Sequence, residues 1–507
     1  MKKKVIYIVI YLLLLALMIA AEAMLAYEVL RLDMLPDLYV AALIGIFAVL
    51  TTGVALLLFV HRKGKWIGIA RQIIACVLIA VTVAGCVFAA PKVRKLRSTV
   101  NHITAPADVG PTRSIYVKID DPAQTIQDAS NYTFAALTRD EYCAKQVVKA
   151  LENELGKEIT LEYFDDESLM IVAYYNNETD ALIINDGFLT VWNENELYAD
   201  FAQKNKLLHS VKVVEDQYRD TMEEEEEIEQ PEEADITNTP FILYISGMDT
   251  NAELLSNTRS DTNILMVINP NTKQILMVST PRDYYIVHPW GNGGKDKLTH
   301  CGIYGIQCSI DALENLYGCS VDHYFRINFK GMETLVDALG GITVYSDNSF
   351  ICGAFNEVYI AAGENHLQGH EALEFAKDRR HQPGGDLGRG QNQMKVIKSI
   401  IGKVTSGRTL IANYAAILSS LEGMLATSVP AEDISKLVKM QLSDMAQWNV
   451  LSYGATGYHG NETTYSMPGL ATYVMHPYFS TVNYGKELIG RVMNGEILTQ
   501  DDMTMPK

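Results

Sequence analysis

Three long apolar stretches near the amino end constrain this 507-residue chain more than any other feature. They cover residues 5–21, 38–60 and 67–90, and each is close to the roughly 20 residues that a helix needs to cross the hydrocarbon core of a bilayer. The first stretch alone resembles a signal peptide, but no small-residue cleavage site followed by a polar segment is evident. We therefore predict three membrane-spanning helices.

Charges beside the stretches predict the orientation. The bases of Lys2–Lys4 and of residues 62–65 mark the cytoplasmic side, whereas the loop between the first two stretches is acidic. The expected location is the cell membrane, as a multi-pass protein with its carboxyl-terminal domains outside the cell. Four bases at positions 92–97 oppose this orientation; we interpret them as headgroup anchors, and an inverted topology is the alternative.

The distribution of charge divides the rest of the chain. The formal net charge of −19 argues against a general nucleic-acid binder, and residues 220–235 hold ten acids and no base. Such a segment repels itself and stays solvated, and it lacks the glycine-containing spacing of a calcium loop. We predict a membrane anchor over residues 1–97, an accessory α/β domain over 98–219, an acidic linker over 220–239 and a larger α/β domain over 240–507.

The accessory domain shows no catalytic constellation. Strand-like runs cover residues 115–119, 171–175 and 181–184, and a helical pattern covers 139–155. A structural or docking role is expected.

The larger domain alternates strand and helix patterns. Residues 241–246, 264–269, 274–279, 323–328 and 342–345 read as strands. The second and third flank Pro270-Asn271-Thr272 and predict a hairpin. Amphipathic helices are predicted over 307–317 and 332–338. The fold class expected is an α/β sandwich with a central mixed sheet.

Charged side chains gather where these strands end, which is where α/β proteins place their sites. Several arginines converging in an acidic domain indicate an anionic ligand, and the planar guanidinium suits bidentate phosphate binding. The polar set comprises Asp249, Arg259, Asp261, Arg282, Asp283, Lys297, His300, Lys377, Arg379, Arg380, Asp386, Arg389 and Gln393.

Two carboxylates lie in this basic neighbourhood. Asp249 and Asp261 could form ion pairs with Arg259 or Arg282, or they could hold Mg²⁺, which takes one or two carboxylates and completes its shell with phosphate oxygens and water. Both interpretations stay open. With a metal ion, the set would be a phosphoryl-transfer site.

Ordered motifs carry a family resemblance. Residues 259–263 (RSDTN), 279–283 (STPRD), 297–300 (KLTH), 337–342 (DALGGI) and 363–389, which end in Gly388-Arg389, resemble the LytR-CpsA-Psr (LCP) family of Gram-positive cell-wall enzymes. The three-span anchor followed by an extra module resembles the capsule-associated branch.

The resemblance implies an activity. It is transfer of a phosphate-linked glycopolymer, such as a capsule polysaccharide or a teichoic acid, from a polyprenyl-pyrophosphate carrier to peptidoglycan, with Mg²⁺ or Mn²⁺. A pyrophosphatase side activity is one alternative. Another is a non-catalytic regulator or scaffold of capsule synthesis that binds lipid phosphate.

Site residues follow from the resemblance by position. Asp249 and Asp261 match metal-binding carboxylates, and Arg282, Arg379 and Arg389 match arginines that contact pyrophosphate. We add Arg259 and Asp283 to the catalytic set, and assign substrate binding to Lys297, Lys377, Asp386 and Gln393. Asp283 and Asp261 are the candidates for a general base.

Two positions depart from the family pattern, which usually has arginine at Lys377 and at Asn392. Lysine lacks the planar fork, so bidentate binding at 377 is in doubt, and the lost charge at 392 is expected to weaken the pocket or change the donor. Arg389 is expected to be exposed, so that replacing it with alanine removes activity without lowering the melting temperature.

Seven cysteines complete the inventory. Their spacing matches no zinc motif. Five of them follow the membrane segment, and spacing alone does not fix a disulfide pairing among these five.

Overall fold

The structure is a computed structural model that describes residues 2–60, 65–104, 112–192, 198–213, 235–248, 258–291, 293–355, 357–406, 421 and 423–506. The chain forms two compact units: residues 1–105 with 402–422 and 429–447, and residues 106–401 with 423–428 and 448–507. Asp249 and most of the acidic segment (residues 220–234) lie outside the described residues.

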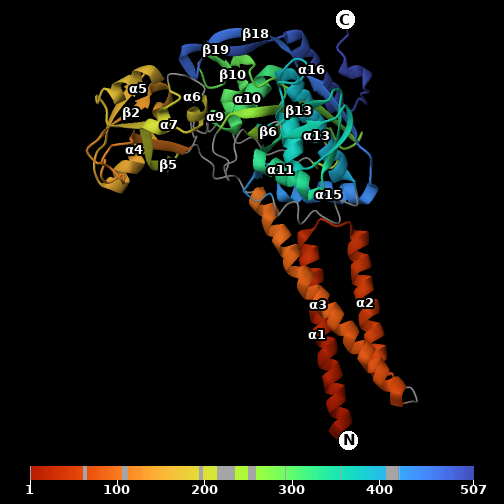
Figure 1. The fold of residues 1–507 in the computed structure, drawn as a ribbon. Coiled ribbons are helices and arrows are strands. Elements are labelled where there is room, and N and C mark those ends of the chain that lie inside the picture. The colour runs from red at the N-terminus through yellow and green to blue at the C-terminus, as the bar shows by residue number, and fades with distance from the viewer. Residues whose placement is uncertain are drawn as a thin grey trace, which may run out of the picture. The chain divides into compact units, whose positions relative to one another are not determined.

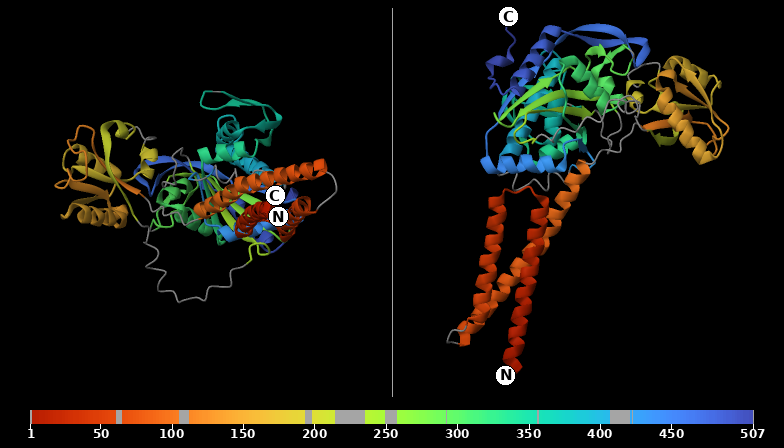
Figure 2. Two further views of the ribbon diagram at one scale, coloured as in Figure 1. Left: turned by 90° about the horizontal axis from the view of Figure 1, so that it is seen from below. Right: turned by 180° about the vertical axis from the view of Figure 1, so that it is seen from behind.

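The first unit contains the three predicted spans, and all three are confirmed as helices. They are α1 (Lys2–Leu32), α2 (Asp37–Phe59) and α3 (Lys65–Ile103), which lie side by side in Figures 1 and 2, and each is long and apolar enough to cross a membrane. Polar contacts join them, because Arg94 pairs with Glu28 at 2.6 Å and Thr51 donates to Glu22 at 2.7 Å. In the same unit, Lys439 of α15 (Ala431–Asp444) pairs with Asp33 at 2.6 Å.

The accessory part of the second unit is a five-stranded sheet in the order β3-β2-β4-β1-β5. Its elements are β1 (Thr112–Lys118), β2 (Thr133–Leu137), η1 (Thr138–Asp140), α4 (Glu141–Leu155), β3 (Thr160–Phe164), α5 (Glu167–Tyr175), β4 (Ala181–Asn185), α6 (Gly187–Trp192), α7 (Phe201–Lys204) and β5 (Asn205–Lys212).

One predicted strand of this part is wrong. Residues 171–175 belong to helix α5, whose first turn is capped by the Asp166 carboxylate accepting from the Leu169 N–H at 2.9 Å. A short apolar run suits a buried strand and a buried helix equally well, so periodicity alone does not separate them.

The larger part is built on a mixed sheet, as predicted. The sheet has six strands in the order β16-β11-β6-β7-β8-β17. Strands β6-β7-β8 form an antiparallel meander, while β11 pairs parallel to β6 and β17 pairs parallel to β8. The carboxyl ends of β6, β8, β11 and β17 and the amino end of β7 therefore share one edge. The strands are β6 (Phe241–Met248), β7 (Ser260–Asn269), β8 (Gln274–Ser279), β11 (His323–Asn328), β16 (Leu425–Thr427) and β17 (Asn449–Gly454).

Helices cover both faces of this sheet, which confirms the sandwich. One face packs with α10 (Ile306–Tyr317) and α16 (Phe479–Met493), and the other with α13 (Asp386–Thr405). A smaller core lies around α12 (Gly369–Lys377). The remaining elements are β9 (Tyr285–Val287), β10 (Lys295–Lys297), α9 (Leu298–Tyr304), α11 (Phe329–Ala338), β12 (Ile342–Ser346), β13 (Phe350–Cys352), β14 (Val358–Ile360), β15 (Gly363–Leu367), β18 (Gly457–Thr464), β19 (Met467–Pro477) and η2 (Asp501–Met503).

Candidate active site

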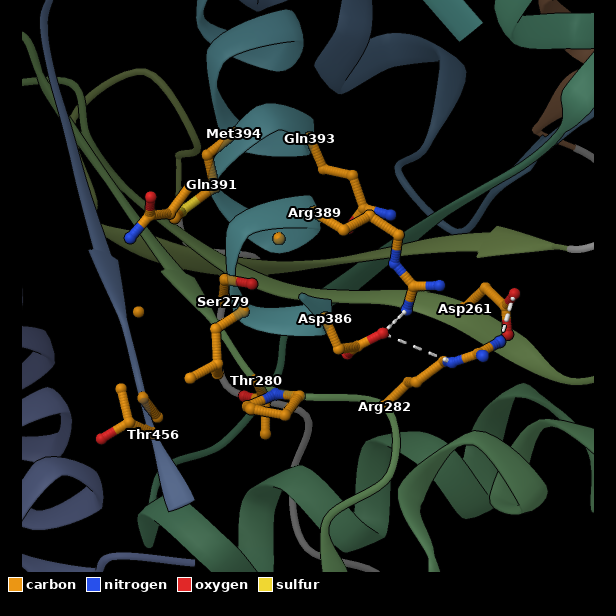
Figure 3. A pocket seen from close by; sticks show the side chains of 15 residues that line it. Asp261, Ser279, Thr280, Arg282, Asp386, Arg389, Gln391, Gln393, Met394 and Thr456 are labelled. Carbon is orange, nitrogen blue, oxygen red and sulfur yellow. Dashed lines mark hydrogen bonds and ion pairs between the residues drawn. The ribbon is translucent and has the colours of Figure 1, made fainter. Parts of the chain in front are cut away.

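A pocket opens at the shared edge of the large sheet, between the ends of β8 and β17 and the first turns of α13 (Figure 3). It holds about 420 Å³ of space not filled by atoms, part of it open to solvent. The lining residues are Asp261, Ser279, Thr280, Pro281, Arg282, Asp386, Leu387, Arg389, Gly390, Gln391, Gln393, Met394, Gly454, Ala455 and Thr456.

Two arginines enter the pocket from different elements. Arg282 follows β8, and its carbonyl oxygen accepts from the Thr299 N–H of α9 at 2.8 Å, which fixes the backbone there. Arg389 lies in the first turn of α13. The turn before that helix packs closely against the helix at Gly388, where a Cβ atom would lie 2.7 Å from the Pro383 carbonyl oxygen. The start of a helix also favours an anion through its exposed N–H groups.

Three aspartates partner these arginines. Arg282 binds Asp261 at 2.7 Å, while its Nε atom lies 3.6 Å from Asp283 and 3.8 Å from Asp386. Arg389 lies 2.7 Å from the Oδ1 atom of Asp386. Figure 3 shows Asp261, Arg282, Asp386 and Arg389 pointing toward one another along one wall.

The pairing in this cluster is incomplete. Within the part of the chain that the structure describes, the Nε atoms of Arg282 and Arg389 are buried without a hydrogen-bond partner, and the Oδ1 atom of Asp386 contacts Arg389 as an ion pair that lacks hydrogen-bond geometry. Buried polar atoms are nearly always hydrogen-bonded, so unpaired ones need an explanation. Guanidinium N–H groups left in this state are donors available to an anionic ligand.

The pKa values also show that burial of these charged groups is only partly compensated. Burial raises the pKa of Asp261, but Arg282 and Arg389 outweigh it and hold that pKa below its usual value, so the carboxylate is ionised. For Asp386 burial prevails over Arg389, and its pKa is raised. Burial also lowers the pKa of Arg389. Both members of the Arg389–Asp386 pair are thus less favourable in their charged forms than in water, a mark of functional sites.

Other predicted residues lie beside the pocket. Gln393 lines it, Lys297 lies 3.4 Å from Asp283, and the buried Arg259 helps to hold the pKa of Asp261 down. The catalytic and substrate-binding assignments made for these side chains remain predictions.

The Lys377–Arg379 segment is placed differently. Both side chains are exposed, and neither is among the residues lining the pocket. The Lys377 ammonium lies 4.5 Å from the centre of the Phe329 ring and 3.4 Å from Glu374. Of the arginines predicted to contact pyrophosphate, the pocket therefore brings together Arg282 and Arg389.

Two expectations about α13 change. Arg389 is not exposed, because only 7% of it is accessible, so its replacement by alanine would leave Asp386 without its closest cationic partner. The Asn392 side chain is buried and donates to the Phe375 carbonyl oxygen of α12 at 3.3 Å. Position 392 thus serves the packing of two helices.

Of the two carboxylates predicted to hold a divalent cation, the structure describes only one. Asp249 lies outside the described residues. Asp261 fits a hard cation, because it is ionised and lines the pocket, and its Oδ1 atom has a long hydrogen bond of 3.3 Å from Thr299. Its Oδ2 atom accepts from Arg282, so ion pairing, the alternative reading, is present in the structure.

The sequence patterns missed two contributions. Thr299 lies within the motif at 297–300 but received no role, although it donates to Asp261. Gly454, Ala455 and Thr456 also went unassigned. The apolar run of β17 before them could have indicated their place. This strand is parallel to β8, so both strands end at the same edge of the sheet.

Comparison with known proteins identifies the family. The model of the LytR_cpsA_psr family matches residues 207–473, more than half of the chain. The chain belongs to the LytR_cpsA_psr family. The resemblance inferred from the motifs is confirmed.

Named relatives are transferases. The chain is 34% identical over 200 residues to the polyisoprenyl-teichoic acid–peptidoglycan teichoic acid transferase TagU of Enterococcus faecalis, covering 39% of this chain and 64% of the relative. TagU of Bacillus licheniformis is 34% identical over 202 residues with the same coverage. The chain thus spans slightly less than two thirds of these relatives. The crystal structure of B. subtilis TagU is 27% identical, with a TM-score of 0.40, over 52% of this chain and 100% of that one.

Proposed function

We propose that this protein is a membrane-anchored phosphotransferase that moves a phosphate-linked glycopolymer from a polyprenyl-pyrophosphate carrier to peptidoglycan. The observation that carries the proposal is the pair of buried arginines, Arg282 and Arg389, in one pocket at the strand ends. Among the described residues, their Nε atoms have no hydrogen-bond partner. The family membership and the transferase names of the relatives support it.

The reaction exchanges a phosphoanhydride bond for a phosphodiester bond. A hydroxyl oxygen of the acceptor glycan bonds to the phosphorus that carries the donor sugar, and the bond from that phosphorus to the bridging oxygen breaks. Polyprenyl phosphate leaves, and the acceptor proton passes to a base. Arg282 and Arg389 donate to the phosphate oxygens, where they hold the pyrophosphate in line and neutralise charge in the transition state.

The pKa directions rank the possible bases. Asp261 was a candidate, but its lowered pKa and its bond to Arg282 make it a weak proton acceptor. Asp386 lines the same pocket with a raised pKa, which suits it better. Asp283, the other candidate, pairs with Lys297. We infer that Asp386 takes the proton.

A divalent cation belongs to the proposal. Mg²⁺ or Mn²⁺ would be held by Asp261 together with Asp249, and it would supply positive charge to the phosphate oxygens. Arg379 and Lys377 are proposed to meet the substrate outside the pocket.

The orientation also remains a proposal: the acidic accessory and catalytic parts face the cell exterior, where peptidoglycan is found. Protease treatment of intact cells tests it, since an exterior catalytic part is cut and a cytoplasmic one is protected.

The decisive experiment uses the full chain in detergent with a short polyprenyl-pyrophosphate oligosaccharide, peptidoglycan fragments and Mg²⁺. We expect polyprenyl phosphate to be released and the oligosaccharide phosphate to join the glycan. Release without acceptor would show the pyrophosphatase activity. Binding without any release, from folded protein, would overturn the enzyme proposal in favour of the non-catalytic regulator.

A further inference from the structure

Two cysteines and a histidine meet in the core beneath α9 and α10, apart from the residues that line the pocket. The sulfur atoms of Cys301 and Cys308 and one ring nitrogen of His288 all lie within 4.8 Å of one another. All three side chains are buried, and the two cysteines belong to the large core cluster. We propose that Cys301 and Cys308 form a disulfide bond that joins α9 to α10.

The chain between the two cysteines is built for this approach. In a continuous helix, residues seven positions apart are separated by roughly 10 Å along the axis, which is beyond the reach of a disulfide. Here α9 ends at Tyr304, and Gly305 adopts a φ of 124°, a conformation that favours glycine, before α10 begins at Ile306. The break turns the chain and brings the sulfur atoms, which are free thiols in the structure, within 4.8 Å of each other.

The position of the proton on the His288 ring argues against a metal ion between His288 and the two cysteines. The Trp290 N–H donates to the Nδ1 atom of His288 at 3.2 Å, so the lone pair of Nδ1 is engaged. Burial lowers the pKa of His288 to about 4, so the ring is neutral near pH 7 and its single proton lies on Nε2. That atom faces the Cys308 sulfur at 3.5 Å. A metal ion would need the lone pair of Nε2, whereas a sulfur atom accepts its proton in a hydrogen bond.

The bond forms by thiol–disulfide exchange with an external small-molecule or protein disulfide. One cysteine thiolate attacks that disulfide and releases one thiol, and the second thiolate then displaces the other. The two cysteines lose two electrons in all and the external disulfide gains them, while the two cysteine protons pass to the released thiolates or to solvent. Because both sulfurs are buried, exchange takes place while α9 and α10 are still unpacked, and the finished bond is protected from reductants.

The bond would hold a helix that reaches the arginine pocket. Thr299, in the same short helix as Cys301, donates to Asp261 through its side chain at 3.3 Å and to the Arg282 carbonyl oxygen through its N–H at 2.8 Å. The cross-link itself does not depend on the proposed transferase activity, so the two proposals fail separately.

The test uses the full-length protein, folded in a glutathione redox buffer, unfolded in denaturant with N-ethylmaleimide present to block free thiols, and then digested with chymotrypsin. Cleavage after Tyr304 separates the two cysteines, so a disulfide appears in the mass spectrum as two joined peptides. We expect Cys301 joined to Cys308, and protein that is reduced in denaturant and refolded with a reductant present should melt roughly 5 °C lower.

Matched variants locate the effect. The reductant-dependent shift should vanish in Cys301→Ala and persist in Cys352→Ala, which alters a buried cysteine of a different core cluster. Recovery of both cysteines as maleimide adducts under oxidising conditions would overturn the proposal. So would pairing of Cys301 with Cys319, or a stoichiometric zinc or copper ion in the folded protein by elemental analysis.

Discussion

The accessory part and the pocket-forming part of this protein both bury arginines beside carboxylates, but the number of hydrogen bonds that join each arginine to its carboxylate differs. In the accessory part, Arg113 binds Asp140 through two short hydrogen bonds of 2.5 and 2.6 Å. In the pocket, Arg282 makes one such bond, to Asp261, and among the described residues the buried Nε atoms of Arg282 and Arg389 have no hydrogen-bond partner. The two-bond pair suits a structural role, whereas the less completely bonded arginines suit anion binding.

The difference has an energetic reading. A two-pronged arginine–carboxylate pair recovers much of the cost of desolvating its charges. The Arg389–Asp386 pair does not, since burial raises the pKa of one member and lowers the pKa of the other. A ligand carrying two phosphates would offset the free-energy cost of burying these charged groups. We therefore assign the binding role to the pocket and not to the accessory pair.

The largest expected effect comes from Arg389→Lys. Lysine keeps a charge beside Asp386 but lacks the planar fork, so we expect kcat/KM for the lipid-pyrophosphate donor to fall about 100-fold with little change in melting temperature. Lys395→Ala is the control, because Lys395 lies on the same helix and pairs with Asp347. Equal losses of kcat/KM in both variants would contradict a specific role of Arg389 in the pocket.

Arg113→Met should have the reverse profile. It leaves Asp140 without this partner, so we expect a loss of about 3 kcal/mol in the stability of the accessory part and little change in turnover. Hydrogen–deuterium exchange of residues 112–118 measures the loss. Adding Asp140→Leu removes the unpaired carboxylate and should restore most of the protection. A failure to do so would mean that the loss does not come from leaving Asp140 without its partner.

Inorganic pyrophosphate sharpens the comparison at the level of binding. At about 100 times its dissociation constant it should raise the melting temperature of the wild-type protein by roughly 5 °C. Arg282→Gln should abolish that shift, whereas Arg113→Met should keep it. A shift that survives in Arg282→Gln would place the anion elsewhere.

The smallest effect is the stability of Asp386→Asn. A carboxyl whose pKa is raised by folding contributes stability only when protonated, at low pH, and this contribution is lost as the pH rises through the raised pKa. At pH 7 the variant should therefore melt slightly above wild type, and the gap should close as the pH falls toward about 4, the pKa of a free aspartate. Turnover should also drop if Asp386 takes the proton. A gap that widens on acidification would contradict the direction of the pKa shift.

Much of the fold followed from local pattern. Strands β8 and β11 occupy the predicted residues, because apolar runs bounded by turn residues specify strands well. The motif at 279–283 also placed Arg282 correctly at a strand end. The strand predicted over 171–175 failed because tertiary packing and a capping aspartate, not periodicity, made it helical.

The site was less accessible to sequence reasoning. Which cations line the pocket depends on the path of the turn between α12 and α13, and no periodic pattern encodes that path. Arg379 therefore looked equivalent to Arg389 and proved exposed. The meeting of His288 with Cys301 and Cys308 was equally hidden, because it depends on the break in the chain at Gly305.

Ile303 of α9 and Met467 of β19 are buried in a cluster formed mostly by accessory side chains, and Asn185 donates to the Ile303 carbonyl oxygen at 3.1 Å. A recombinant fragment that starts after the acidic segment would uncover both apolar side chains and strip one end of α9 of its neighbours, while the other end still supports Asp261. Poor solubility or weak turnover of such a fragment would then reflect a damaged surface rather than the loss of residues that take part in the proposed reaction.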